Sequence, residues 1–151
     1  MSAARPAPGV RFVYITHMAS EDIQAESNAR DILAIQDLLA RYGLYLDDED
    51  MASWRELWTE DAEMHAFRRV WTGPEEIAAH IAQADPGLHM AGVPSVSLHG
   101  DHATSVQNFI FVGKDGHGLR LGHYVDELRR VDGQWRFSVR RIVFMKSTPP
   151  S

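Results

Sequence analysis

The pattern of apolar residues changes its period near residue 86, and this change constrains the fold more than any other feature of the sequence. Before that point, apolar residues recur at spacings of three and four, which is typical of amphipathic helices. After it, apolar and polar residues alternate, and turn signals stand at residues 100–101, 114–118 and 131–133. Helical patterns followed by strand patterns predict an α+β domain, because segregated helices and hairpins leave no room for parallel crossovers.

Three helices are predicted in the first half of the chain. Ser27 or Asn28 caps the first, over residues 28–46, whose apolar positions are Ile32, Ile35, Leu38, Leu39, Tyr42 and Leu46. A short second helix is predicted over residues 53–58, followed by a strand over residues 62–67. Pro74 opens the third helix, which runs to Ala84, since the missing N–H of proline costs least in a first turn.

Four further strands are predicted over residues 88–99, 102–112, 118–130 and 134–145. The Asp132-Gly133 turn is a strong hairpin signal between the last two. We expect a four-stranded antiparallel meander wrapped around the first helix. The predicted fold is a cone-shaped α+β barrel, with three helices packed on a curved, mainly antiparallel sheet around a cavity.

Length and composition predict one soluble domain. A chain of 151 residues that is 44% hydrophobic can build one core, which we place in residues 21–151. Residues 1–20 form a predicted N-terminal extension with a short β-type run at residues 10–15. Because no apolar run is long enough for a membrane span or a signal peptide, we expect a cytoplasmic protein without membrane contact.

The same composition excludes several kinds of chemistry. The absence of cysteine excludes disulfides, thiolate metal sites and a cysteine nucleophile. Eight histidines are present, but none stands in a spacing typical of a zinc site, so we predict no metal and no cofactor. A net charge of −6 with dispersed basic residues makes nucleic acid an unsuitable partner.

Several motifs resemble the SnoaL-like branch of the NTF2-like superfamily over roughly residues 28–146. They lie at residues 41–64 (RYGLYLDDEDMASWRELWTEDAEM), 72–77 (TGPEEI) and 122–141 (GHYVDELRRVDGQWRFSVRR). Within that superfamily the chain resembles three lyases: scytalone dehydratase, bile acid 7α-dehydratase and hexachlorocyclohexane dehydrochlorinase. These enzymes pair an aspartate at the end of the first helix with a histidine on the first strand after the third helix. The matching residues here are Asp47 and His89, and Tyr42 matches a tyrosine of the bile acid enzyme.

The resemblance implies a metal-free lyase, of dehydratase type, for a hydrophobic cyclic or polyketide-like substrate. Elimination next to an activated C–H needs a base whose pKa lies near neutrality, and histidine is that side chain. We therefore assign His89 as general base and Asp47 as the group that orients it. Tyr42 is the predicted hydrogen-bond donor to the leaving group or to a carbonyl that gains charge.

Five further residues are predicted to bind the substrate: His65, His123, Asn108, Arg141 and Trp54. Arg140 or Arg141 would stand in for an arginine that the bile acid enzyme carries on its last strand. The resemblance also implies a homo-oligomer, either a dimer or a trimer, because this fold leaves a sheet face exposed.

Two alternatives stay open at this point. In the first, the chain is an allylic isomerase resembling ketosteroid isomerase, with Tyr42 and Asp126 holding an oxyanion. In the second, the chain is a non-catalytic ligand-binding protein or partner subunit of the same fold, and aromatic side chains fill its pocket.

Overall fold

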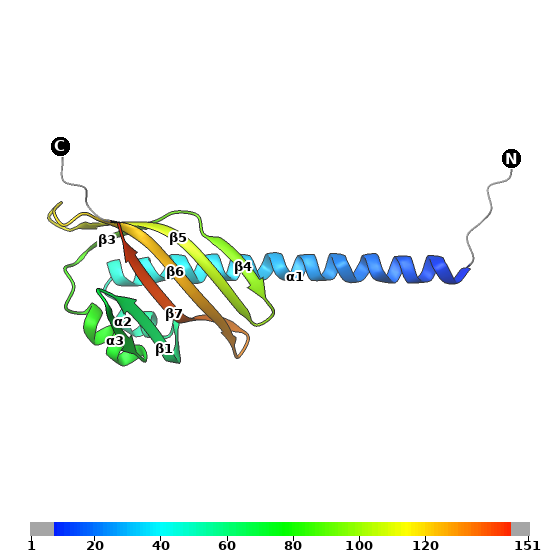
Figure 1. The fold of residues 1–151 in the computed structure, drawn as a ribbon, viewed down its shortest axis with the longest axis horizontal. Helices are drawn as coiled ribbons and strands as arrows, with labels where there is room; N and C mark the ends of the chain where they lie inside the picture. Colours follow the sequence, from blue (N-terminus) through cyan, green and yellow to red (C-terminus); the bar gives the residue numbers. More distant parts are fainter. Residues whose placement is uncertain (1–7, 146–151) are drawn as a thin grey trace. The chain divides into compact units, whose positions relative to one another are not determined.

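The structure of the protein is a computed structural model that describes residues 8–145, with side chains from residue 19 onward. The chain forms two compact units, Met1–Leu33 and Ala34–Ser151. Helix α1, Pro8–Asp47, contributes residues to both units (Figure 1). None of the helices within the described residues is long and apolar enough to cross a membrane.

In the first unit, the described residues 8–33 are helical, so the β-type run predicted at residues 10–15 is wrong. The chain contains neither glycine nor proline between residues 10 and 42, and nothing interrupts helix propagation there. The boundary predicted at residue 20 falls inside α1. Side chains of residues 19–30 are exposed, and the pairs Gln24–Asn28 and Arg30–Glu26 link successive turns.

The second unit is built on a seven-stranded sheet in the order β2-β1-β7-β6-β5-β3, with β4 also paired to β5 (Figure 1). The strands are β1 Trp58–Ala66, β2 Arg69–Thr72, β3 Gly87–Ala91, β4 Ser95–His99, β5 His102–Gly113, β6 Arg120–Val131 and β7 Gln134–Phe144. The sheet is curved and does not close, since β2 and β3 form its two edges. The predicted α+β class, with three helices on a mainly antiparallel sheet, is confirmed.

Two features of the sheet differ from the prediction. The strand predicted over residues 88–99 is two strands, β3 and β4, because Gly92 and Pro94 interrupt it and proline has no N–H for the ladder. Strand β1 runs parallel to β7, with Met64 opposite Arg140, although no parallel pairing was expected. This pairing joins strands from the two ends of the domain, which local sequence patterns cannot reveal.

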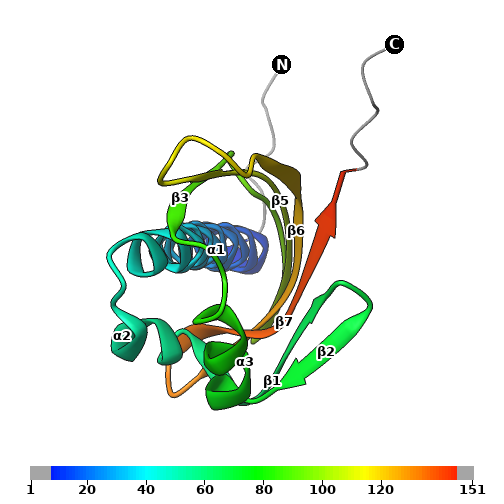
Figure 2. The same ribbon diagram turned by 90° about the vertical axis from the view of Figure 1, so that its left-hand side faces the viewer.

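The end of α1 lies inside the curve of the sheet. Helix α3 (Pro74–Ile81) lies beside β1 and β2, and α2 (Met51–Arg55) packs against α3 (Figure 2). Helix α2 begins two residues before its predicted start, since the Asp50 side chain caps it by accepting the Ser53 N–H. Within residues 34–47, Ile35, Leu38, Leu39 and Tyr42 are buried in a core shared with Trp54, Trp58, Met64 and Phe137.

Candidate functional site

Asp47 and His89 meet where the last turn of α1 touches the edge strand β3. The Asp47 carboxylate lies 2.7 Å from Nδ1 of His89 and accepts the backbone N–H of His89 at 3.0 and 3.1 Å. Both side chains are mostly buried, at 15% and 22% exposed. Because a carboxylate only accepts, Nδ1 carries the shared proton and Nε2 keeps the lone pair of the imidazole.

Gly43 explains how the helix and strand come so close. A Cβ atom at Gly43 would stand 3.2 Å from Cβ of His89, tighter than an ordinary contact. Glycine inside a helix costs about 1 kcal/mol relative to alanine. Without a side chain at Gly43, β3 can approach α1 closely enough for Asp47, one turn further along the helix, to reach the imidazole.

Tyr42 supplies a phenol close to His89. Its ring centre lies 6.4 Å from that of His89, with the planes nearly perpendicular, and the side chain is 2% exposed. Burial raises the pKa of the Tyr42 hydroxyl, although the positive charge of the neighbouring Arg140 opposes this effect. Tyr42 is therefore a protonated hydrogen-bond donor at neutral pH.

A buried ion pair packs against the ring of Tyr42. Arg140 on β7 donates two hydrogen bonds of 2.8 Å to Asp126 on β6, and Ser105 on β5 donates a third at 3.1 Å. The guanidinium carbon lies 4.0 Å from the ring centres of both Tyr42 and Tyr124. Burial alone would lower the pKa of Arg140, but its attraction to Asp126 raises the pKa above its ordinary value.

A cavity of about 480 Å³ opens beside these groups, within the size range of small-molecule sites. Tyr42, His89 and Tyr124 are among the polar residues that line its wall. Most of the remaining wall is apolar, with Met64, Ile81, Phe109, Phe111, Ile142 and Phe144 among its residues. Such a cavity suits a largely apolar molecule that meets a base and two phenols.

Two of the residues predicted to bind substrate lie on the outer face of the sheet. Asn108 and His123 are opposite each other on β5 and β6, while their neighbours Phe109 and Tyr124 point inward. This follows from the two-residue period of a strand, which sends adjacent side chains to opposite faces. The structure does not bring Asn108 or His123 to the cavity.

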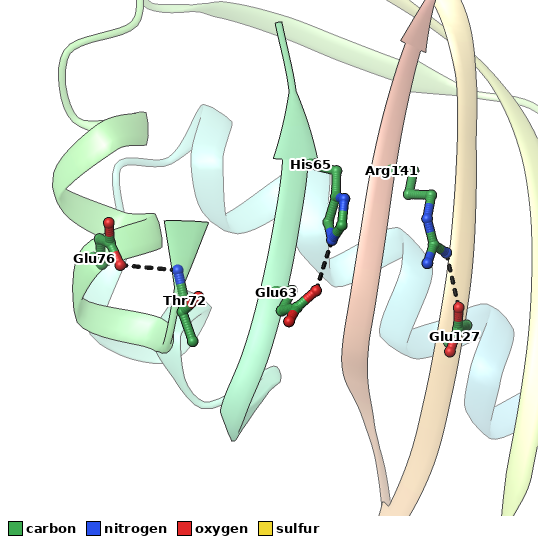
Figure 3. Close-up of polar contacts among 6 residues, drawn as sticks. All are labelled: Glu63, His65, Thr72, Glu76, Glu127 and Arg141. Atoms are coloured by element: carbon green, nitrogen blue, oxygen red, sulfur yellow. Dashed lines mark hydrogen bonds and ion pairs between the residues drawn. The ribbon is translucent and has the colours of Figure 1, made fainter. Parts of the chain in front are cut away.

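The other three predicted binding residues also lie away from the cavity. His65 contacts Glu63 at 2.7 Å, and Arg141 pairs with Glu127 at 2.8 Å (Figure 3). The same view includes the Glu76 carboxylate at the start of α3, which accepts the backbone N–H of Thr72. Trp54 is fully buried in the core beneath Tyr42, with ring centres 5.5 Å apart. Of the two arginines considered for the pocket, Arg140 points inward and Arg141 outward.

Sequence reasoning missed several residues of the cavity wall, including Tyr124, Phe111, His80 and Arg120. The ring of His80 stacks on Trp71 at 3.7 Å, and burial followed by the charge of Arg69 lowers its pKa. The alternation of residues along β6 could have identified Tyr124 as an inward residue, because Tyr124 lies on the same face as the buried Leu128. That signal becomes useful only when the inward face is known.

Within residues 19–145, whose side chains are described, no group of three or more histidine, aspartate or glutamate side chains is arranged to hold a metal ion. The polar side chains that line the cavity are instead two histidines, two tyrosines, two acids and one arginine.

The sequence matches the SnoaL-like domain family over residues 27–141, which is more than half of the chain. The chain belongs to the SnoaL-like family. No curated protein sequence matches it. Among solved structures, this SnoaL-like protein is similar to a variant of a Mycobacterium tuberculosis protein of unknown function. The two share 27% identity over 82% of this chain and 76% of that chain, with a TM-score of 0.75.

Two further structures of similar fold have names that denote eliminating enzymes. A candidate scytalone dehydratase from Novosphingobium aromaticivorans shares 20% identity, with coverage of 84% and 92% and a TM-score of 0.72. A hexachlorocyclohexane dehydrochlorinase from Novosphingobium barchaimii shares 21% identity, with coverage of 82% and 92% and a TM-score of 0.71. At this identity the likeness establishes the SnoaL-like fold. Similar structures therefore include both lyase-type enzymes and proteins of unknown function.

Proposed function

We propose that this SnoaL-like protein is a metal-free lyase that catalyses a dehydratase-type β-elimination on a hydrophobic cyclic or polyketide-like molecule. The observation that carries the proposal is the 2.7 Å contact between Asp47 and Nδ1 of His89 at the wall of an apolar cavity. An oriented imidazole is suited to abstract a proton from a carbon acid, because histidine as a residue type titrates near neutrality. The lyase-type enzymes of similar fold add support.

In the proposed reaction, Nε2 of His89 removes a proton from the carbon beside a carbonyl or another activating group. The electrons of that C–H bond form the new double bond. The leaving group departs from the neighbouring carbon with the electron pair of the bond that breaks. Asp47 stabilises the imidazolium that forms. Tyr42 donates a hydrogen bond to the leaving oxygen or to the carbonyl oxygen as negative charge develops there.

The two alternatives receive less support. An isomerase resembling ketosteroid isomerase would use Asp126 as a hydrogen-bond donor to an oxyanion. Both oxygens of Asp126 instead accept hydrogen bonds from Arg140, which suits a carboxylate with a structural role. A non-catalytic subunit would not need an acid–base pair beside a cavity. The predicted oligomeric state stays a prediction.

A base-catalysed elimination that needs no knowledge of the natural substrate tests the proposal. The ring opening of 5-nitrobenzisoxazole begins with proton abstraction from carbon and releases a coloured phenolate. We expect the protein to accelerate it, and His89→Ala to lower that rate by about 10²–10⁴-fold, the usual contribution of a positioned base. Asp47→Asn should lower the rate by a smaller factor, because the imidazole remains but loses its orienting anion.

The matched control is His123→Ala, which removes an imidazole from the outer face of the same sheet. Its rate should equal that of the unmodified protein. Acceleration that survives His89→Ala unchanged would contradict the assignment of the base. A rate no faster than that of free imidazole at the same concentration would contradict the lyase proposal itself.

A further inference from the structure

Arg120 is the cation at the rim of the cavity. It begins β6, lines the cavity wall, and keeps 40% of its side chain exposed, so it stands where the cavity meets solvent. It is the only arginine or lysine among the described residues that line this cavity. The guanidinium carbon lies 5.2 Å from the ring centre of Phe111, its partner across the β5–β6 ladder, and this cation–π contact holds the charge in place.

The charge of Arg120 is available to a ligand. The nearest acid is Asp85, whose carboxylate lies 3.6 Å away, beyond hydrogen-bond distance, and is 82% exposed. A pair of this kind is weak because solvent screens it. The other acid on the cavity wall, Glu49, contacts Lys114 at 3.1 Å, so its charge is already balanced by a residue outside the wall.

Phe111 links this cation to the candidate base. The centre of its ring lies 5.0 Å from that of His89 and 5.2 Å from the guanidinium carbon of Arg120. The guanidinium is therefore no farther from the imidazole than the sum of those two distances. Gly87 leaves room for this arrangement, because a Cβ atom there would stand 2.4 Å from Cζ of Phe111.

We infer that the cavity takes an amphipathic acid, whose carboxylate binds Arg120 while its apolar body packs on Phe111 and extends toward His89 and Tyr42. A guanidinium presents paired N–H donors that match the two oxygens of a carboxylate, and the aromatic wall suits the body. The inference rests on the proposed function for the identity of the reacting end. Recognition of the acid group by Arg120 does not require turnover.

Three probes of one shape separate the contribution of charge from that of the apolar body: 2-naphthoate, its neutral isostere 2-naphthamide, and the cationic 2-naphthylmethylamine. Their dissociation constants are measured by isothermal titration at pH 7.5, where the naphthoate is ionised. We expect the protein to bind the naphthoate about tenfold more tightly than the amide, the size of one net charge-assisted contact at a partly exposed site. Added salt should weaken naphthoate binding and leave amide binding unchanged.

Arg120→Gln should bring the naphthoate-to-amide ratio close to one without changing the affinity for the amide, and Arg120→Lys should retain part of the preference. The matched control is Arg30→Gln, which makes the same change in net charge at an exposed helix position in the other unit. An equal ratio in the unmodified protein, a ratio that survives Arg120→Gln, or tighter binding of the amine would each overturn the inference. Failure of all three probes to bind at millimolar concentration would overturn it as well.

The His89→Ala variant separates this inference from the proposed function. It should abolish the accelerated elimination yet preserve the naphthoate-to-amide ratio, because the acid group binds at the far side of Phe111. A protein that discriminates between the probes but never catalyses elimination would retain the binding assignment and lose the lyase assignment.

Discussion

Removing one partner of the buried Arg140–Asp126 pair should be far more damaging than removing both. Each side chain is fully buried, and the two hydrogen bonds between them measure 2.8 Å. Asp126→Asn preserves the shape of the side chain but leaves the guanidinium charge uncompensated in the core. Breaking such a pair costs about 3–5 kcal/mol. Since a domain of this size is typically stable by roughly 5–15 kcal/mol, this one change should remove a large part of the total.

The double variant Asp126→Leu with Arg140→Met removes both charges and fills the space with apolar atoms. Its free energy of unfolding should match or exceed that of the unmodified protein by about 1–4 kcal/mol, because neither ion has to be desolvated. Urea unfolding followed by tryptophan fluorescence measures both variants, since Trp54 and Trp58 lie in the same core. The test requires that the slope of free energy against urea stays constant.

The neighbouring pair Arg141–Glu127 provides a control on the same two strands. Its side chains are 40% and 50% exposed, so Glu127→Gln should change stability by less than about 1 kcal/mol. If Asp126→Asn costs no more than this control, the guanidinium is not an uncompensated charge in the variant and the reasoning fails. Because Arg140 packs on Tyr42 and Tyr124, the loss of Asp126 should also lower the rate of elimination.

Three further predictions concern single side chains of the site. Tyr42→Phe should lower the rate of an elimination that expels hydroxide by about tenfold or more while the protein still folds, since only the donor is lost; an unchanged rate would remove Tyr42 from the mechanism. Gly43→Ala should slow catalysis, because the new Cβ presses on His89. Its stability should change by no more than about 1 kcal/mol, since the higher helix propensity of alanine offsets part of the cost. Equal rates would show that β3 shifts to make room for the new Cβ. The pKa of His80 is lowered in the folded state, so the unfolded chain binds the proton more readily and the free energy of unfolding should fall as the pH drops below 6.5. Between pH 7.5 and pH 5.5, His80→Gln should lose less of this free energy than the unmodified protein.

Local sequence patterns predicted the positions of helices and strands better than they predicted which strands pair. The spacing of Ile35, Leu38 and Leu39 indicated the buried face of α1, and Pro74 and the Asp132-Gly133 turn marked a helix start and a hairpin. The extra strand break at Gly92 and Pro94 was missed, although proline is a known signal for it. The parallel pairing of β1 with β7 was also missed, because it depends on how distant segments pack.

The candidate site also combines features that the sequence predicted with features that it did not. Resemblance to a family placed Asp47 and His89 together, 42 residues apart in the chain, which no periodicity could have done. Tyr42 and Asp47 stand five residues apart, which turns the helix by about 140°, so their side chains leave the helix in different directions. His89 is in fact reached by both side chains, since the strand crosses the helix end at Gly43, where no side chain intervenes.

The sequence by itself determined the α+β class, the identity of most elements and the chemical groups available for catalysis. These follow from local spacing and composition, which act over a few residues. Only the tertiary structure decided which face of each strand is inward, and hence that Tyr124 and Arg140 point inward while His123 and Arg141 point outward. The period of a strand is two, so the pattern offers two faces, and only packing against α1 chooses between them.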